Sequence, residues 1–513
     1  VEWQFGPRIN EAFAQIKNHL DPLNLLSPNR IINPPKMDDT RLMRFPPGYK
    51  VIPIRTALDW SAWNVQNDPV TEQTSAPGSG GDAAQGLAKA VEMCNNNGHC
   101  RKFDAGTMCP SYRVTRDEKH LTRGRANTLR LALSGQLEGM KAEDAFTSEA
   151  VKDALELCVG CKGCKRDCPT GVDMAKMKVE FLHHYKAKHG YTLKDKLVAY
   201  LPDYAPWASR LAPLLNLRDR IPGLAALSEK LLGLSAGRTL PQWQSKTFFN
   251  ATPVSATRDE VLAASKPVVL FVDTFNGYFE SGNARSALKV LQAGGYTVHI
   301  ASKTVADGKQ LCCGRTYLAS GMVDEAKAKA KELVAALLPF AEQGIAIVGL
   351  EPSCLLTLRD EMLVMGLGQA AQTISQHALL FEEFLAREAA AGKLEELKAQ
   401  LQPADQAILL HGHCHQKAFG AVSPILDVLK LIPGAQPELI ESSCCGMAGS
   451  FGYEASHYEV SMQMAELSLL PAVRQQPDAI VVADGTSCRH QIRDGAQREA
   501  LHVAVLLAGQ LRV

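Results

Sequence analysis

Apolar positions divide the chain into two regions with different periodicity. From residue 86 to residue 190 they recur at helical spacing, as in NTLRLALSGQLEG and SEAVKDALEL. From residue 266 onward, short β-rich runs such as VVLFVDTF and YTVHIAS alternate with helical segments such as ARSALKVLQAGG. That alternation is typical of a parallel sheet covered by helices. The pattern predicts a multidomain α + α/β protein in which a helical module precedes α/β lobes.

The α/β region contains an internal repeat. Three pairs of segments correspond: VVLFVDTF (268–275) with AILLHGHC (407–414), LCCGRTYLASG (311–321) with SCCGMAGSFGY (443–453), and IAIVGLEPSC (345–354) with DAIVVADGTSC (478–488). Each copy predicts a strand, a Cys-Cys-Gly turn that leads into a helix, and a strand that ends in a cysteine. We therefore expect two α/β lobes related by a pseudo-twofold axis. In this alignment Phe275 stands where the second copy has Cys414.

Shifts in composition predict the domain boundaries. Residues 1–36 join a helical pattern to the turn-rich run DPLNLLSPNRIINPPK, and we expect them to be the end of a larger domain. Residues 66–85 are polar and rich in Pro and Gly, which predicts a flexible linker within residues 37–85. The predicted order after this linker is the helical module (86–190), a helical connector (191–265), lobe 1 (266–380), a second helical connector (381–404) and lobe 2 (405–513).

Composition excludes several classes of protein. The 55 Lys and Arg residues balance 54 Asp and Glu residues, which excludes broad electrostatic capture of nucleic acid. No run approaches the ~18 apolar residues of a membrane-spanning helix, and the start Val1-Glu2-Trp3-Gln4 lacks both an initiator Met and an export signal. We expect a fragment or processed product located in the cytoplasm. The Leu- and Pro-rich residues 200–245 suit either short helices packed on a neighbouring domain or contact with the inner face of a membrane.

The 14 cysteines form two clusters, one between residues 94 and 168 and the other between residues 312 and 488. A disulfide scaffold is usually a short secreted chain, so a long chain without an export signal favours metal binding or redox chemistry. One run has the spacing of a bacterial ferredoxin [4Fe–4S] site: Cys158-x2-Cys161-x2-Cys164-x3-Cys168-Pro169. Zinc is the competing metal, but zinc ribbons usually separate two CxxC pairs by a longer loop.

An incomplete second run lies upstream, Cys94-x5-Cys100-x8-Cys109-Pro110, with Asn97 in place of its second cysteine. In two-cluster ferredoxins the fourth cysteine of each run ligates the other cluster. Crossed ligation therefore predicts one [4Fe–4S] cluster with these ligands: Cys158, Cys161, Cys164 and Cys109. It leaves Cys94, Cys100 and Cys168 for a second cluster, which is completed by a group such as His99, contains three irons, or is absent.

The cysteines of the lobes are candidates for a further metal site. Each lobe ends in a single cysteine, in EPSC and GTSC, where a complete copy would have CxxC. His411, His413 and His415 flank Cys414, and thiolate together with imidazole suits iron or zinc. The alternative is a scaffold in which buried cysteines pack as small apolar residues. We predict that the ligands gather between the lobes, and they are Cys312, Cys313, Cys354, Cys414, Cys444, Cys445, Cys488, His413 and His415.

A family resemblance rests on two segments, CNNNGHCRKFDAGTMCPSYRVTRDEKHLTRGRANTLRLALSG and CVGCKGCKRDCPTGVDMAKMK. They resemble the iron–sulfur half of the long bacterial FAD-linked oxidases, whose best-known members are D-2-hydroxyglutarate dehydrogenases. The resemblance covers essentially the whole chain. Residues 84–190 resemble a helical ferredoxin-type module, and residues 1–36 resemble the end of the flavoprotein's substrate-side domain. The lobes resemble the paired Cys-Cys-Gly domains of the glycolate oxidase iron–sulfur subunit, the anaerobic glycerol-3-phosphate dehydrogenase subunit and heterodisulfide reductase.

This resemblance implies the electron-transfer module of an FAD-dependent D-2-hydroxy acid dehydrogenase, with D-2-hydroxyglutarate oxidised to 2-oxoglutarate as the favoured reaction. FAD would be bound by a half of the enzyme that lies outside this chain. Electrons would pass from the flavin through the [4Fe–4S] cluster to a quinone or a soluble carrier. The implied partners are the FAD-binding half, the hydroxy acid, the acceptor and further copies in a homo-oligomer. Two alternatives remain open: a thiol–disulfide redox subunit like heterodisulfide reductase, and a non-catalytic zinc-binding assembly module.

Overall fold

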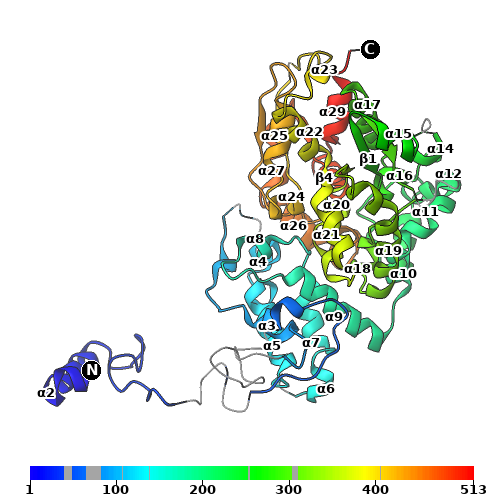
Figure 1. Cartoon of the computed structure of the whole chain (residues 1–513). Coiled ribbons are helices and arrows are strands. Elements are labelled where there is room, and N and C mark those ends of the chain that lie inside the picture. Colours follow the sequence, from blue (N-terminus) through cyan, green and yellow to red (C-terminus); the bar gives the residue numbers. More distant parts are fainter. Residues whose placement is uncertain are drawn as a thin grey trace.

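The structure, a computed structural model, describes residues 1–39, 45, 49–64, 82–104, 106, 108–137, 139–251, 255–302, 310–404 and 406–512. Residues 66–81 of the predicted linker lie outside this part of the chain. Figure 1 shows the helical module below the two lobes, with α2 (Pro7–Leu20) standing apart from both. Neither α1 (Glu2–Phe5) nor α2 buries a side chain. The assignment of residues 1–36 to a larger domain stays a prediction.

Short helices joined by capped turns form the helical module. Their bounds are η1 (Ser61–Trp63), α3 (Leu87–Glu92), η2 (His99–Arg101), α4 (Pro110–Thr115), η3 (Glu118–His120), α5 (Thr122–Leu133), α6 (Ala142–Ala145), α7 (Glu149–Glu156), α8 (Gly163–Asp167) and α9 (Met174–His189). Ser148 and Asp173 cap the first turns of α7 and α9. The buried Glu180 carboxylate on α9 accepts hydrogen bonds from Leu58 N (2.9 Å) and Trp60 Nε1 (3.0 Å). These bonds hold the segment around residue 60 against the module.

Residues 191–265 fold mainly as short helices, as the prolines predict. Their bounds are α10 (Leu193–Ala199), α11 (Leu201–Arg210), α12 (Ala212–Leu215), η4 (Asn216–Asp219), α13 (Leu224–Leu232), α14 (Phe248–Ala251) and α15 (Arg258–Ala263). Trp207 and Leu231 are each more than half exposed on their helices. Over the described ranges, no helix is both long enough and apolar enough to cross a membrane. Contact with a membrane surface stays a prediction.

Each lobe is built on a parallel sheet of four strands. Lobe 1 has the strand order β2-β1-β3-β4, and lobe 2 has the order β6-β5-β7-β8. The strand bounds are β1 (Pro267–Phe271), β2 (Thr297–Ile300), β3 (Ala346–Gly349), β4 (Ala378–Leu380), β5 (Ile408–Leu410), β6 (Pro437–Leu439), β7 (Ile480–Val482) and β8 (Ala500–Leu501). The predicted α/β organisation with two parallel sheets is confirmed, while the pseudo-twofold axis between the lobes stays a prediction.

Helices cover both sheets and join the lobes. In lobe 1 and the second connector they are α16 (Thr274–Tyr278), α17 (Ser281–Ala293), α18 (Arg315–Ala319), α19 (Val323–Ala341), α20 (Pro352–Leu358), η5 (Glu361–Val364), α21 (Gly368–His377), α22 (Phe381–Ala390) and α23 (Glu395–Lys398). In lobe 2 they are α24 (Cys414–Ala418), α25 (Ser423–Leu429), η6 (Phe451–Tyr453), α26 (Tyr458–Glu466), α27 (Leu469–Gln475), α28 (Thr486–Ala496) and α29 (Val503–Gly509).

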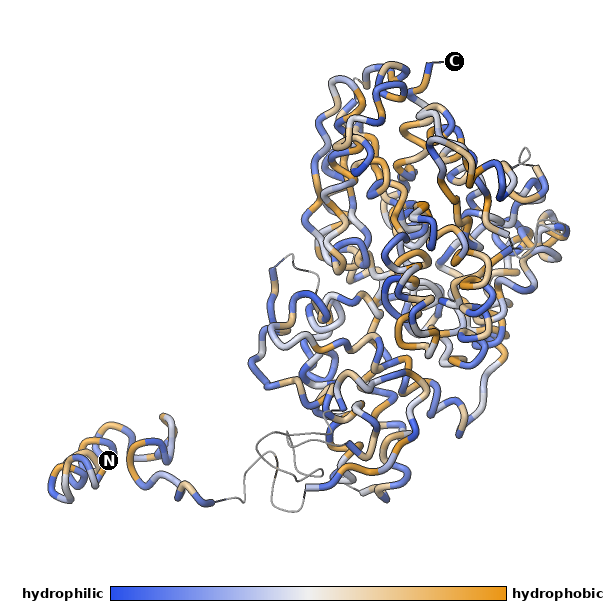
Figure 2. The backbone as a smooth tube through the Cα atoms, viewed as in Figure 1, coloured by the Kyte–Doolittle hydropathy of each residue, from blue (hydrophilic) through white to orange (hydrophobic). Residues whose placement is uncertain are grey.

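One apolar core crosses the boundary between the lobes. Helix α17 packs on α29, and α22 packs on α25. The core that these pairs share includes Leu288 and Phe384 from the first half and Val428 and Leu507 from the second. Figure 2 shows apolar segments in the interior of this body. Because the core is shared, the two lobes form one rigid support for the cysteines at their strand ends.

Candidate functional site

Four cysteines from two distant segments line one small cavity in the helical module. They are Cys109, Cys158, Cys161 and Cys164, and the rest of the wall includes Thr122, Arg125 and Lys162. The loop turns sharply at Gly160 and Lys162, which both have φ near 59°, and Cys109 itself has φ 48° just before α4. The left-handed backbone at these residues lets the two segments turn their thiols toward the cavity. The structure thus brings together the four side chains that crossed ligation predicts.

The surroundings of these thiols suit a cationic group. Burial raises the pKa of the Cys109, Cys161 and Cys164 thiols above the ordinary value. The Thr122 backbone N–H donates to Cys109 Sγ at 3.2 Å, and its hydroxyl lies at the same distance. Buried thiolates need a positive partner, and an iron cluster supplies one while accepting hydrogen bonds on its sulfur ligands. The donor set therefore fits a [4Fe–4S] cluster.

The other three cysteines of the module lie outside the lining of this cavity. Cys94 and Cys100 are buried, whereas Cys168 is only partly buried and its Sγ lies 3.3 Å from Thr170 Oγ1. Burial, together with the nearby thiols of Cys109 and Cys94, raises the pKa of Cys100 to about 11. A second cluster at these positions stays a prediction.

In lobe 1, three thiols contact one another at the ends of the central strands. Cys313 forms hydrogen bonds with both Cys312 and Cys354. The bond from Cys313 lowers the pKa of Cys354, but burial and two nearby carboxylates outweigh it and raise that pKa to about 12. Burial and thiol contact also raise the pKa of Cys312 and Cys313. The lobe 1 thiols are therefore protonated unless a metal displaces their protons.

In lobe 2, four thiols contact one another: Cys414, Cys444, Cys445 and Cys488. A hydrogen bond from Cys444 lowers the pKa of Cys414 to about 6, and the same donor lowers the pKa of Cys445. The buried Lys417 ammonium donates to the Ser442 carbonyl beside them. Lobe 2 thus holds thiolate character that lobe 1 lacks, and thiolate is the form that binds metals.

The strand register corrects the alignment of the two lobes. Leu270 pairs with Val348 in lobe 1, and Leu410 pairs with Val482 in lobe 2. Helices α16 and α24 begin after the N-cap residues Asp273 and His413, and helices α20 and α28 begin after Glu351 and Gly485. The strand pairing and the caps together place Thr274, rather than Phe275, at the position of Cys414. Lobe 1 therefore has a hydroxyl where lobe 2 has a thiol, and Gln310 Nε2 donates to that hydroxyl at 2.9 Å.

The three histidines around Cys414 have different surroundings. His411 contacts Cys445, and burial lowers the pKa of this imidazole to about 4, so the ring is neutral. His413 Nδ1 accepts from His415 N at 3.1 Å and caps α24. His415 Nε2 donates to the Gly160 carbonyl at 3.0 Å. His415 therefore links lobe 2 to the cysteine loop of the helical module, whereas His411 acts on Cys445 and His413 on Cys414.

The metal-binding geometry of the lobes is incomplete. Among the residues that the structure describes, no three His, Cys, Asp or Glu side chains are already arranged as ligands of one metal ion. The thiols instead form a set of three in lobe 1 and a set of four in lobe 2, and contacts are made within each set. A metal site in the lobes stays a prediction.

The lobes meet at a buried ion pair. The Glu280 carboxylate of lobe 1 accepts from Arg489 Nε at 3.1 Å and from Thr486 Oγ1 at 2.7 Å in lobe 2. Burial disfavours the charged form of Glu280, but Arg489 outweighs it and lowers the pKa to about 2. The Glu351 carboxylate, at the start of α20, also accepts from Thr486 N at 2.9 Å. These bonds fix the two sets of thiols relative to each other, and nothing in the local sequence pattern marks them.

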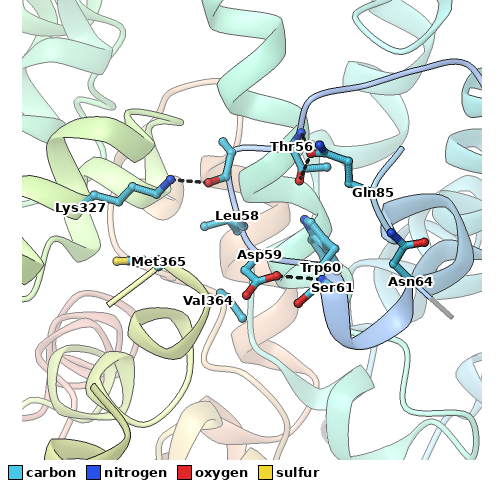
Figure 3. A pocket seen from close by; sticks show the side chains of 12 residues that line it. Thr56, Leu58, Asp59, Trp60, Ser61, Asn64, Gln85, Lys327, Val364 and Met365 are labelled. Carbon is cyan, nitrogen blue, oxygen red and sulfur yellow. Dashed lines mark hydrogen bonds between the residues drawn. The ribbon is translucent and has the colours of Figure 1, made fainter. Parts of the chain in front are cut away.

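A larger hollow of about 430 Å³ lies away from the cysteines, between the segment around residue 60 and lobe 1 (Figure 3). Lys327 Nζ donates to the Ala57 carbonyl at 2.5 Å across it, and Asp59 accepts from Ser61 N at 2.8 Å. Its lining contains no cysteine. These contacts attach the module to lobe 1 and offer no redox group.

The chain resembles known proteins over nearly all of its length. Residues 90–172 match a 4Fe-4S dicluster domain, and residues 276–359 and 408–493 each match a cysteine-rich domain. The chain is 25% identical to D-2-hydroxyglutarate dehydrogenase of Escherichia coli K12 over 533 residues, which cover 95% of this chain and 48% of that protein. It is 27% identical to a subunit of the anaerobic glycerol-3-phosphate dehydrogenase of the same strain, over 65% of this chain and 81% of that protein.

A third relative is the probable glycolate oxidase iron-sulfur subunit of Bacillus subtilis 168, 25% identical over 78% of this chain and 90% of that protein. The chain is homologous to all three proteins, and it spans about half the length of the D-2-hydroxyglutarate dehydrogenase. The predicted iron–sulfur module and paired cysteine-rich lobes are confirmed by these matches.

Proposed function

We propose that this iron–sulfur module, an oxidoreductase component homologous to dehydrogenase and oxidase subunits, takes electrons from a flavin and passes them to a separate acceptor. One observation carries the proposal: Cys109, Cys158, Cys161 and Cys164 converge on one cavity from segments about 50 residues apart, as a crossed ferredoxin site requires. These four residues would hold a [4Fe–4S] cluster. The cluster supplies the capacity to accept and release single electrons.

The residues of the module prepare the site for that group. The Thr122 N–H bond to Cys109 Sγ stabilises negative charge on this ligand. The Arg125 guanidinium, which is buried, is fixed by bonds to Ala154 O (3.0 Å) and Ser111 Oγ (2.9 Å) in the cavity wall. The surrounding core limits access of water. The fixed polar contacts and the limited access of water both favour a cluster that is held rigidly and can be reduced.

We propose that the electron passes from the cluster of the module to lobe 2. Cys161 packs in the same buried group as Cys414, Cys444 and Cys488. Helix α8, which follows Cys161, also packs against α24, which begins at Cys414. We propose that the four lobe 2 thiols, with His411, hold iron or zinc, and that the acceptor is a quinone or a soluble carrier.

The favoured substrate is D-2-hydroxyglutarate, oxidised to 2-oxoglutarate by an FAD-bearing partner. Support comes from the name of the relative in Escherichia coli K12, together with the share of the chain that the match covers. Because this chain spans about half of that relative, FAD, substrate and partner are all proposed for the complete enzyme. A thiol–disulfide redox subunit is the second candidate, and the mutual contacts of the lobe 2 thiols beside Cys161 favour it.

Anaerobic purification followed by analysis of iron, sulfide and zinc tests the proposal. We expect iron and acid-labile sulfide, with absorption near ~400 nm from thiolate-to-iron charge transfer. Cys161→Ala should lose most of this absorption, whereas Cys354→Ala, a buried cysteine of lobe 1, should retain it. Zinc without sulfide would reject the cluster, and unchanged iron and absorption in Cys161→Ala would reject the ligand assignment.

A further inference from the structure

The cysteine loop of the module inserts a lysine into lobe 1. Lys162 lies between Cys161 and Cys164, lines the same cavity, and is only 2% exposed. Its Nζ lies 2.5 Å from Asp360 Oδ2 and 2.6 Å from Glu361 Oε1. Asp360 is the N-cap of η5 in lobe 1, Glu361 is the first residue of η5, and both carboxylates are equally buried. Two carboxylates of lobe 1 are thus paired with a lysine that lines the cavity of the candidate cluster.

Further charges complete the group. Lys165 and Lys176 lie 2.7 Å and 3.1 Å from Asp360 Oδ1. Arg315 pairs with Glu361, and its Nη2 lies 3.8 Å from the position that a Cβ on Gly160 would occupy. Asp173 lies 3.8 Å from Lys176. We call this set the charge network: Lys162, Lys165, Lys176, Arg315, Asp173, Asp360 and Glu361.

The charge network carries an excess of positive charge. Burial opposes ionisation of Asp360, but the surrounding lysines lower its pKa well below the ordinary value. Lys162 and Arg315 likewise outweigh burial and lower the pKa of Glu361. The network joins four cationic side chains to three carboxylates, so its formal charges leave one positive charge. Buried ion pairs contribute little net stability in general, so stability alone does not explain the arrangement.

Reduction of a four-thiolate [4Fe–4S] cluster adds one electron and changes its total charge from 2− to 3−, with no bond made or broken. A fixed positive charge nearby stabilises the more negative form, and a fixed negative charge disfavours it. Because Lys162, Asp360 and Glu361 are shielded from water, their charges act more strongly here than at the surface.

We propose that the charge network sets the reduction potential of the module's cluster, with Lys162 raising it and Asp360 lowering it. This inference rests on the proposed function, since it requires the cluster. Lys162 is a positioning residue for charge and does not ligate iron. The contact also makes the potential depend on docking of lobe 1, because both carboxylates belong to that lobe.

Opposite shifts in two variants test the proposal. The potential of the cluster in the purified chain is measured by anaerobic titration with dithionite, followed by electron paramagnetic resonance. In Lys162→Met we expect the ratio of reduced to oxidised cluster at a fixed potential to fall about tenfold, which is ~59 mV for a one-electron couple. In Asp360→Asn we expect that ratio to rise. A role in packing alone would not give shifts of opposite sign.

Two further variants sharpen the comparison. Lys165→Gln should shift the potential downward by less than Lys162→Met, because Lys165 is 36% exposed and is screened by water. Lys188→Gln is the matched control, since Lys188 pairs with Asp144 on the exposed side of the module, and it should leave the potential unchanged. If Asp360→Asn does not fold, Glu361→Gln replaces it with the same expected direction.

The outcomes separate this inference from the function on which it rests. Shifts of the same sign, or no shift, in protein with a full complement of iron and sulfide would overturn the role of the charge network and leave the electron-transfer function standing. Wild-type protein without iron and sulfide would overturn both.

Discussion

Removing one partner of the ion pair between the lobes should lower stability measurably, because it leaves the other charge buried and unpaired. Glu280 and Arg489 are held together at the boundary where both sets of thiols lie, and Arg489 is 6% exposed. The pKa of Glu280 falls from 4.5 to about 2 on folding. A difference of this size corresponds to about 3 kcal/mol, and the 21% exposure of the Glu280 side chain makes this an upper value. Glu280→Gln should therefore lower stability by about 2–3 kcal/mol.

A double-mutant cycle distinguishes the pair from general damage. Arg489→Met should also destabilise, because it leaves the Glu280 charge buried. The double variant should lose less than the sum of the single losses, since neither charge is then left unpaired. Denaturation followed by circular dichroism gives the midpoints, and the exposed pair Arg474 and Glu466 is the control, with an expected effect within about 0.5 kcal/mol.

The pH dependence of the same variants gives a second check. The folded pKa of Glu280 lies below its unfolded value, so its contribution is complete above about pH 4.5 and is lost as the pH falls toward 2. The gap between wild type and Glu280→Gln should be constant from pH 8 to pH 5.5 and should narrow below pH 4.5. Additive losses in the cycle, or a gap that already changes near neutral pH, would refute the reasoning.

Two other predictions concern close contacts. Gly446→Ala should destabilise lobe 2 by about 1–3 kcal/mol in thermal unfolding, because φ is +85° and the new Cβ would lie 2.4 Å from the Ser461 carbonyl; Gly282→Ala, where nothing lies within 4 Å, is the control. Glu180→Gln should weaken the attachment of the segment around residue 60 and speed its cleavage by protease. Equal stability of both glycine variants, or unchanged cleavage, would count against these assignments.

Local chemistry made part of the fold predictable. The spacing of Cys158, Cys161 and Cys164 determines a loop around one centre, and Pro110 after Cys109 marks the second contributor. The charge network was not predictable in this way. Lys162 and Asp360 are 198 residues apart, and no local pattern encodes a pairing over that separation.

The register of the repeat was the point at which sequence comparison was wrong. Strands β1 and β5 are buried on both faces, so their apolar residues do not alternate with polar ones and a shift by one residue leaves the pattern unchanged. The N-cap residues that reveal the register, Asp273 and His413, differ in type and do not align by identity. Only the strand pairing and the caps together place Thr274 opposite Cys414.

This register leads to a last prediction, which rests on the proposed metal site in the lobes. Thr274→Cys would give lobe 1 four thiols in the arrangement of lobe 2, next to Cys312, Cys313 and Cys354. Because thiolate is the ligand form and a fourth thiol completes a tetrahedral set, we expect this variant to bind one more iron or zinc per chain than the wild type. Phe275→Cys adds the same thiol one residue later and is the matched control, with no expected gain. Metal analysis after anaerobic reconstitution measures both. If only Phe275→Cys binds more metal, the alignment by sequence is correct after all. If neither variant binds more metal, the lobe 1 thiols are packing residues and not three ligands of an incomplete site.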